Sequence, residues 1–382
     1  MTSIFTDPYF LAVVLGHFTV DMINSLRSII ITYLSEPLGL TNTMIGVVST
    51  IYVIFGSLSQ PVFGYFNDRI GTRWVVSGGV AWMAVFLSLA VIIPGESSLI
   101  FLIIGSLGSG AVHPAGIAQA TLIGRLKLKG QETTASSMFS LFGSLGYFVG
   151  PILAGILLQA WGLRGLAVLA VAALPVAGLA FRLKNYFTTS KGPQVETISV
   201  EKQGTGMIIA LIALAAFQSW AQQNMAAFLP KYLSDAGWQP ASYGLMIALF
   251  SGGSALGTLF GGRAADRLGK WKVIFFGLGL GAVPFFLIPL ADYSWWLYVL
   301  VPLSGFLTSS CFNAIVVLAQ HLFTVGVGLA SGLTLGFIFA SGALGTLLSG
   351  KLADLYGFDP VFYLSAALAL GGGLLGLLFR KR

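Results

Sequence analysis

The chain has 382 residues, of which 56% are hydrophobic and only 9% are charged, and its net charge is +7. An ordinary soluble domain has about 25% charged residues, so the composition excludes a typical soluble enzyme or binding module. The single cysteine, Cys311, excludes an intramolecular disulfide and indicates no cysteine-based metal site.

Twelve apolar runs follow one another along the chain, and each is long enough to cross a bilayer core about 30 Å thick as a helix. The runs cover 10–34, 44–66, 74–93, 99–122, 135–158, 165–183, 206–229, 242–262, 273–290, 295–320, 325–352 and 360–379. The first is too long for the core of a signal peptide, so we expect a retained span. We predict an all-α polytopic membrane protein with twelve transmembrane helices in two six-helix bundles, 1–185 and 206–382, joined by a polar cytoplasmic linker, 186–205.

Basic residues are distributed unevenly between the predicted loops. If the amino terminus is cytoplasmic, 16 of the 20 Lys and Arg residues lie on the cytoplasmic side. Arg27 lies within the first span, and only Arg164, Lys231 and Lys351 lie near the opposite face. This bias predicts that both termini face the cytoplasm in a cytoplasmic (inner) membrane. We interpret the net positive charge as a topological signal and expect no nucleic-acid partner.

A turn of the form Gly-x-x-x-Asp-Arg-x-Gly occurs twice, at 64–71 and 262–269, at an offset of 198 residues. The repeat indicates that two pseudo-symmetric halves share one plan. We expect the first glycine of each turn to permit close helix approach, the last to reverse the chain, and the aspartate to bind a helix start or an arginine. A plain reverse turn with a charged tip is the alternative. The predicted gating residues here are Gly64, Asp68, Arg69, Gly71, Arg73, Asp266 and Arg267.

A second glycine motif lies in the run at 135–158, where Gly146 and Gly150-Pro151 follow a Gly-x-x-x-Gly-Pro pattern. The proline is expected to bend the helix, and the small residues keep one face open to a neighbouring helix. We assign Gly146, Gly150 and Pro151 to gating. The alternative is a packing face that has no bearing on transport.

Ionisable residues inside the first span oppose its insertion into the membrane, since each raises the insertion free energy by roughly 2.5–3.5 kcal/mol at the middle of a bilayer. His17, Asp21 and Asn24 fall within an arc of about 60° and form one polar stripe, whereas Arg27 could bend toward this stripe or extend outward. His113, in the run at 99–122, lies at a similar depth. If both spans line one cavity, Asp21 and a histidine could share a proton, and on this basis we predict that Asp21, His113 and His17 couple transport to protons. A static Asp–His pair between two helices and a substrate contact alone are the alternatives.

The second half offers neutral polar residues where the first half has charges. Amides and hydroxyls can orient a substrate without fixing a charge, although hydrogen bonds between helices are an equal alternative. The predicted substrate-binding residues are Asn24, Arg27, Gln218, Gln222, Gln223, Ser310 and Asn313.

The two turns and the Gly-Pro motif together resemble the major facilitator superfamily along essentially the whole chain. The strings GHFTVD at 16–21, QPVFG at 60–64 and VHPAG at 112–116 resemble its fosmidomycin-resistance group over about the first 155 residues. The resemblance implies alternating access and proton-driven efflux.

We therefore expect a monomeric secondary active transporter that exports a small organic molecule by proton antiport, with the proton as coupling ion and no other cofactor or metal. A proton-linked importer of an organic anion held by Arg27, or a lipid flippase of the same fold, are the alternatives. An enzyme is not expected because the chain has no HExxH, GxSxG or Walker motif.

Overall fold

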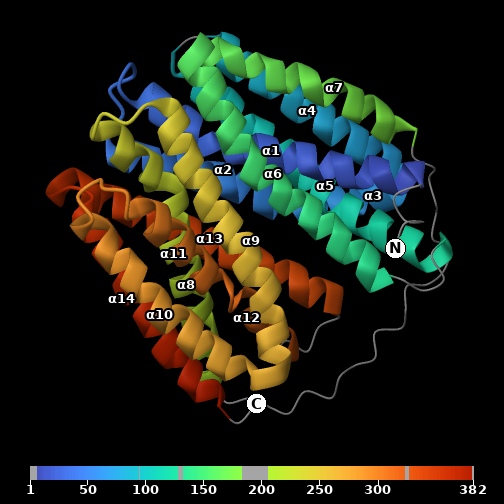
Figure 1. Cartoon of the computed structure of the whole chain (residues 1–382). Helices are drawn as coiled ribbons and strands as arrows, with labels where there is room; N and C mark the ends of the chain where they lie inside the picture. Colours follow the sequence, from blue (N-terminus) through green and yellow to red (C-terminus); the bar gives the residue numbers. More distant parts are fainter. Residues whose placement is uncertain (1–6, 94, 128–131, 183–204, 323–326, 381–382) are drawn as a thin grey trace. The chain divides into compact units, whose positions relative to one another are not determined.

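The computed structural model describes residues 7–93, 95–127, 132–182, 205–322 and 327–380. Within these ranges the regular structure is helical, and twelve segments are long and apolar enough to cross a membrane (Figure 1). The prediction of an all-α chain with twelve spans is therefore confirmed. The predicted linker, 186–205, lies outside the described residues except for its last position.

Fourteen α-helices and two short 3₁₀ helices make up the described part of the chain. They are α1 (Pro8–Ser35), α2 (Asn42–Leu58), α3 (Gln60–Ile70), α4 (Thr72–Ile92), α5 (Ser97–Lys127), α6 (Glu132–Trp161), η1 (Leu163–Leu166), α7 (Ala167–Phe181), α8 (Thr205–Asp235), α9 (Pro240–Leu268), α10 (Lys270–Leu290), α11 (Leu297–Ser309), α12 (Phe312–Leu322), α13 (Val327–Tyr356), α14 (Asp359–Gly376) and η2 (Leu377–Phe379).

The chain divides into two compact units. Unit 1 comprises residues 1–38, 51–190 and 239–248, and unit 2 comprises 39–50, 191–238 and 249–382. In unit 1, α1 packs against α6 and α5, while α4 packs against α5 and α7. In unit 2, α8 packs against α13 and α14, while α10 packs against α11 and α14. Three of these four pairings correspond between the units, as the sequence repeat predicts. The fourth differs, because α1 packs against the fourth span of its half, α5, whereas α8 packs against the last span, α14.

Helix α1 has the largest buried share of the twelve spans. Its first turn is fixed by Asp7, whose carboxylate accepts hydrogen bonds from the backbone N–H of Tyr9 (2.8 Å) and Phe10 (3.0 Å). Such a cap satisfies donors that have no partner within the helix. The central position of α1 in unit 1 means that its polar stripe is enclosed by neighbouring helices.

The two repeated turns have equivalent backbones. Gly71 and Gly269 have φ angles of +92° and +95°, a conformation that side chains with a Cβ rarely adopt. The N–H of each glycine donates to a carbonyl four residues earlier, of Asn67 and Ala265 respectively (3.0 Å each). These glycines therefore end one helix and allow the chain to begin the next after a single residue.

The expectation of close helix approach at the first glycine of each turn is wrong. A methyl group on Gly64 would lie 3.9 Å from Pro114, and one on Gly262 would lie 3.4 Å from the flexible amide of Asn313, so both positions have room. In unit 2 the close approach of α9 to the chain at Ser310 occurs one residue earlier, at Gly261. A Cβ on Gly261 would collide with the carbonyl oxygen of Ser310. The glycine of the repeated motif in unit 2, Gly262, is therefore not the glycine that packs closely against Ser310, which is Gly261.

The glycines of α6 do permit close packing. A Cβ on Gly146 would collide with the carbonyl oxygen of Phe18, and one on Gly150 would collide with the hydroxyl of Ser25. Both partners lie on α1, so the small face predicted for this helix is the face that packs against α1. Helix α6 continues through Pro151. The gating role of these residues stays a prediction.

Candidate functional site

The polar stripe of α1 is buried inside unit 1. His17, Asp21 and Asn24 are 5%, 4% and 8% exposed. His17 Nε2 lies 3.1 Å from Asp21 Oδ2, one helical turn away, and the Asn24 side-chain amide donates to Asp21 Oδ1 at 3.1 Å. The stripe predicted from helical spacing is therefore a connected network centred on the Asp21 carboxylate.

Helix α5 adds the third member of this cluster. His113 Nε2 lies 3.2 Å from Asp21 Oδ1, and the ring centroids of His17 and His113 are 4.9 Å apart at nearly a right angle. The structure thus brings together the three residues predicted for proton coupling. The side chain of His113 is 29% exposed, whereas that of Asp21 is 6% exposed. His113 is consequently the more accessible of these two side chains.

Backbone carbonyls fix which nitrogen of each histidine carries a proton. His17 Nδ1 lies 2.7 Å from the carbonyl oxygen of Phe139, and His113 Nδ1 lies 2.8 Å from that of Ser109. A carbonyl oxygen only accepts, so each Nδ1 must donate. In a neutral imidazole the other nitrogen, Nε2, then carries a lone pair. Both Nε2 atoms face oxygens of the same carboxylate.

Each of these two Nε2–oxygen contacts therefore needs one proton, located either on the histidine or on the carboxylate. With two protons present, both contacts are hydrogen bonds and the cluster of His17, Asp21 and His113 has a net charge of +1. Loss of both protons would leave two lone pairs against an ionised carboxylate and a net charge of −1. A buried cluster with this arrangement can store and release protons, because its electrostatic energy depends strongly on its proton count.

The space for the cluster comes from residues that the sequence analysis did not single out. A Cβ on Gly143 of α6 would collide with the ring of His17 and lie 2.5 Å from Asp21 Oδ2. One turn earlier, Phe139 stacks on His17 with centroids 3.8 Å apart. Gly143 precedes Gly146 and Gly150 on the same small face of α6, so extending that row of small residues would have found it. The carbonyl of Phe139 leaves no signal in the sequence.

Hydrogen bonds extend from Asn24 to two other helices. Its amide group donates to Ser109 Oγ on α5 (2.8 Å) and accepts from the hydroxyl of Tyr52 on α2 (2.8 Å). The Arg27 guanidinium lies over the Tyr52 ring, 5.2 Å from its centroid, and its buried Nε has no hydrogen-bond partner in the described part of the chain. Of the two directions that the sequence left open for Arg27, the structure places the side chain beside Tyr52.

The neutral polar residues of α8 in unit 2 contact neighbouring helices. Gln218 donates to the carbonyl of Thr308 (3.4 Å), and Gln222 donates to the hydroxyls of Thr308 (3.3 Å) and Ser309 (2.6 Å) on α11. Asn224, which is fully buried, donates to Ser365 on α14 (3.0 Å). These contacts match the alternative of hydrogen bonds between helices, and a role in substrate binding stays a prediction.

The other predicted substrate residues of unit 2 occupy different surroundings. Gln223 is partly exposed. Asn313 is exposed and donates to the carbonyl of Thr258 (3.4 Å). Ser310 donates its hydroxyl to the carbonyl of Leu307 (2.7 Å) and lines an apolar groove between α9, α10 and α11. The hydroxyl of Ser310 is thus used within its own helix turn.

Charged residues at the repeated turns are mostly exposed. Arg69 lies over the Tyr65 ring at 4.4 Å, and Arg73 lies over the Trp74 ring at 5.1 Å. Asp68, Asp266 and Arg267 are exposed. In the described part of the chain, the expected bonds from these two carboxylates to a helix start are not observed.

His17, Asp21 and His113 could also hold a metal ion. Each offers one ligand atom, and these atoms lie within 4.8 Å of one another. Two imidazoles and one carboxylate form a common ligand set for transition metals. The Nδ1–carbonyl bonds of both histidines are the outer contacts that orient imidazole ligands in such sites.

Comparison with known proteins places this chain in a family. The family model for the Major Facilitator Superfamily matches residues 13–209 and 208–382. The chain is 29% identical over 379 residues to the fosmidomycin resistance protein of Escherichia coli (strain K12), covering 95% of this chain and 90% of the relative. It is 26% identical over 348 residues to multidrug resistance protein MdtG of Proteus mirabilis, covering 86% and 83%.

A solved structure shows the same fold. A point mutant of the nucleoside transporter NupG aligns with a TM-score of 0.78 over 98% of this chain and 99% of that chain, at 16% sequence identity. The family match spans both halves of the chain, and the twelve spans agree with it. The chain is therefore a multi-pass membrane protein of the major facilitator superfamily, a secondary transporter of small molecules and not an enzyme.

Proposed function

We propose that this transporter exports a small organic molecule from the cytoplasm in exchange for protons, and that the His17–Asp21–His113 cluster is where protons bind. The observation that carries the proposal is the pair of Nε2–carboxylate contacts at 3.1 and 3.2 Å, each of which needs a proton. The relatives named for fosmidomycin and multidrug resistance support the direction of transport.

Exchange follows from competition for one carboxylate. When the cluster is fully protonated, both oxygens of Asp21 are occupied by the histidines. When it loses protons, the carboxylate is ionised and incompletely paired, and it can accept hydrogen bonds from a cationic or donor-rich substrate. Protons and substrate would then bind Asp21 alternately, which is the condition for antiport. The partly exposed His113 provides the route by which protons reach Asp21.

The proton gradient supplies enough energy for this exchange. One charge moving through 100 mV contributes about 2.3 kcal/mol. Since about 1.4 kcal/mol corresponds to a factor of ten, one proton per substrate can sustain a substrate gradient of about 50-fold. Two protons, the capacity of the two contacts, would sustain the square of that ratio.

The direct test uses everted membrane vesicles with an acidic lumen. Candidate substrates come from a resistance screen in cells that lack their own efflux carriers, with fosmidomycin included because one relative is named for it. We expect the vesicles to accumulate the substrate and to lose it when a protonophore collapses the pH gradient. Accumulation that is insensitive to the protonophore would contradict the proposal. A chelator should have no effect, and inhibition by the chelator would indicate metal coupling instead.

A second candidate function rests on Arg27. This cation lies beside Tyr52 with its Nε unpaired in the described part of the chain, so an organic anion could bind it. Proton loading of the nearby cluster makes the site more positive and would favour anion binding, which is the condition for cotransport into the cell. Uptake by right-side-out vesicles with an acidic exterior, and none by everted vesicles, would support this alternative.

A further inference from the structure

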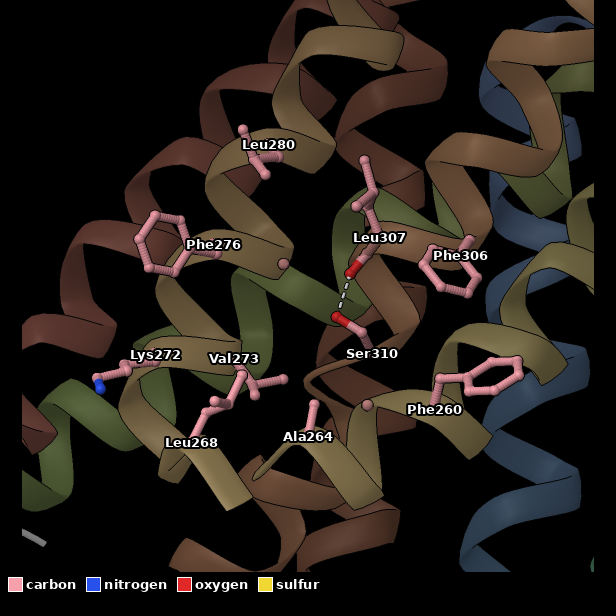
Figure 2. Close-up of a pocket in the computed structure, with 12 residues that line it drawn as sticks. Phe260, Ala264, Leu268, Lys272, Val273, Phe276, Leu280, Phe306, Leu307 and Ser310 are labelled. Atoms are coloured by element: carbon pink, nitrogen blue, oxygen red, sulfur yellow. Dashed lines mark hydrogen bonds between the residues drawn. The ribbon is translucent and has the colours of Figure 1, made fainter. Parts of the chain in front are cut away.

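An apolar groove of about 280 Å³ lies within unit 2 between α9, α10 and α11. Figure 2 shows Phe276 and Leu280 on one side of it and Phe306 and Phe260 on the other. Apart from Lys272 at one end, the hydroxyl of Ser310 is the main polar group of the lining, and it is already bonded to the carbonyl of Leu307 (Figure 2). The lining therefore offers a ligand apolar contact and almost no hydrogen bonding.

Two glycines keep the groove open. Gly261 of α9 lies so close to the backbone of Ser310 that a Cβ would collide with its carbonyl oxygen, and a Cβ on Gly277 of α10 would collide with the Ser310 hydroxyl. Because neither residue has a side chain, the floor between the large side chains is made of backbone. The floor of the groove is thus set by helix packing, and its walls are formed by the large side chains.

The rim of the groove consists of large apolar side chains that are half exposed. Phe260, Phe276 and Leu280 are 53%, 54% and 53% exposed. All three lie on membrane-spanning helices, and exposed apolar side chains at such positions face lipid or a ligand rather than water. The groove therefore opens toward the hydrocarbon region of the bilayer.

A cluster of basic residues lies at one end of the groove. Lys272 lines it at the start of α10, and its ammonium group extends away from the apolar residues (Figure 2). The adjoining segment 263–272 has four basic residues and one acidic residue, Asp266. Trp271 lies between Lys272 and Arg380, with the two cations 5.8 and 5.5 Å from its ring centroid. Tryptophan with basic neighbours is typical of the membrane–water interface.

The length of the groove matches one leaflet of a bilayer. From Lys272 to Leu280 on α10 the rise is about 12 Å, at 1.5 Å per residue. Half of a hydrocarbon core about 30 Å thick is about 15 Å. A molecule with its anionic group at Lys272 would thus place an attached hydrocarbon chain along Val273, Phe276 and Leu280.

We propose that this groove binds one acyl chain of an anionic phospholipid, whose phosphate group pairs with Lys272. Charge complementarity at one end and an almost wholly apolar lining along the rest select this occupant. A free phosphate would leave the groove empty, and a zwitterionic lipid would gain less from the excess of basic residues. The proposal does not depend on the coupling mechanism, because lipid binding is measured without transport.

Native mass spectrometry of the purified transporter tests the proposal, with phosphatidylglycerol and phosphatidylethanolamine added in turn. We expect the wild type to prefer phosphatidylglycerol and inorganic phosphate not to displace it. Removing one charge near the membrane surface costs about 1 kcal/mol, so Lys272→Gln should bind phosphatidylglycerol about fivefold more weakly. Ala264→Phe, which fills the groove, should lose this binding.

Two matched variants control for charge and bulk. Lys351→Gln removes an exposed lysine of α13 outside the groove, and Val283→Phe adds an aromatic ring to an exposed position of α10 that does not line it. Both should bind phosphatidylglycerol as the wild type does. Equal binding of the two lipids by the wild type, or unchanged binding by Lys272→Gln, would overturn the proposal. If Ala264→Phe fails to fold, the exposed Lys272→Gln still decides it.

Discussion

Helices α1 and α8 are the first spans of the two halves and pack against corresponding helices, α6 and α13, but they carry different polar residues. The stripe of α1 contains His17 and Asp21 and recruits a second histidine from α5. The stripe of α8 contains Gln218 and Gln222, which bond to hydroxyl and carbonyl groups of α11. One stripe can change its charge and the other cannot. The two halves of a duplicated scaffold can thus have different roles, with protons bound in unit 1 and neutral hydrogen bonds made in unit 2.

Asp21→Asn should produce the largest difference between the two stripes. An amide cannot be ionised, so neither histidine contact can release a proton through this residue. We expect the protonophore-sensitive accumulation ratio to fall by about 50-fold for each proton lost. The matched variant is Asp292→Asn, which changes an exposed carboxylate in unit 2 to which no transport role is assigned and should keep accumulation. Full accumulation by Asp21→Asn would refute a coupling role for unit 1.

His113→Gln should have a smaller effect than Asp21→Asn. It removes one of the two proton-requiring contacts and the more accessible one. Because one titratable group is lost, transport should depend less on pH, and accumulation should be intermediate between the wild type and Asp21→Asn. Initial rates measured at several pH values check this. A pH profile identical to that of the wild type would show that His113 only joins two helices.

Gly143→Ala should disturb the cluster without removing any titratable group. The added methyl would collide with His17 and approach Asp21 Oδ2, and such overpacking typically costs about 1–3 kcal/mol. We expect lower thermal stability in detergent and weaker coupling. Gly178→Ala is the control, because a Cβ there has nothing within 4 Å. Equal behaviour of the two variants would mean that the cluster is looser than its distances indicate.

Gln222→Leu tests the stripe of unit 2. It removes hydrogen bonds to Thr308 and Ser309, each worth about 1 kcal/mol. If Gln222 also contacts the substrate, KM should rise about fivefold, while the number of protons per substrate stays as in the wild type. A changed proton count in this variant would contradict the division of work between the units.

The repeated turns should show the smallest contrast, since their geometry is the same in both units. At Gly71 and Gly269 the positive φ angles, combined with extended ψ angles of 151° and 141°, make alanine cost about 1–3 kcal/mol. At Gly64 and Gly262 a methyl group has room, so alanine should change stability by less than about 0.5 kcal/mol. Thermal unfolding of the four variants checks this ranking, and a reversed order would contradict the backbone conformations described.

The sequence predicted the spans, their pairing into two similar halves and the residues of the cluster. These succeeded because bilayer thickness fixes helix length and because a buried charge is conspicuous among apolar residues. Helical spacing placed His17 and Asp21 on one face, whereas adding His113 needed its similar depth and the resemblance to the superfamily, which implies that both helices line one cavity. The shape of the turns at Gly71 and Gly269 could be inferred because the backbone itself demands glycine there.

Other features depend on contacts between distant segments and were not predictable. The Phe139 carbonyl that orients His17 belongs to the backbone, which every residue shares. The close approach at Gly261 instead of Gly262 depends on the rotation of α9 against α11, which differs by one residue from the repeated motif. The side-chain direction of Arg27 required knowledge of where the Tyr52 ring lies.

The most direct test of proton coupling measures protons and substrate together. Proteoliposomes containing the purified transporter are loaded with substrate and a pH-sensitive dye, then diluted into substrate-free buffer at equal pH. If protons are exchanged for substrate at the Asp21 cluster, the lumen acidifies as substrate leaves through the wild type, whereas Asp21→Asn releases substrate with no change of lumenal pH. Acidification by Asp21→Asn equal to that of the wild type would contradict this account, and alkalinisation by the wild type would show cotransport instead of exchange.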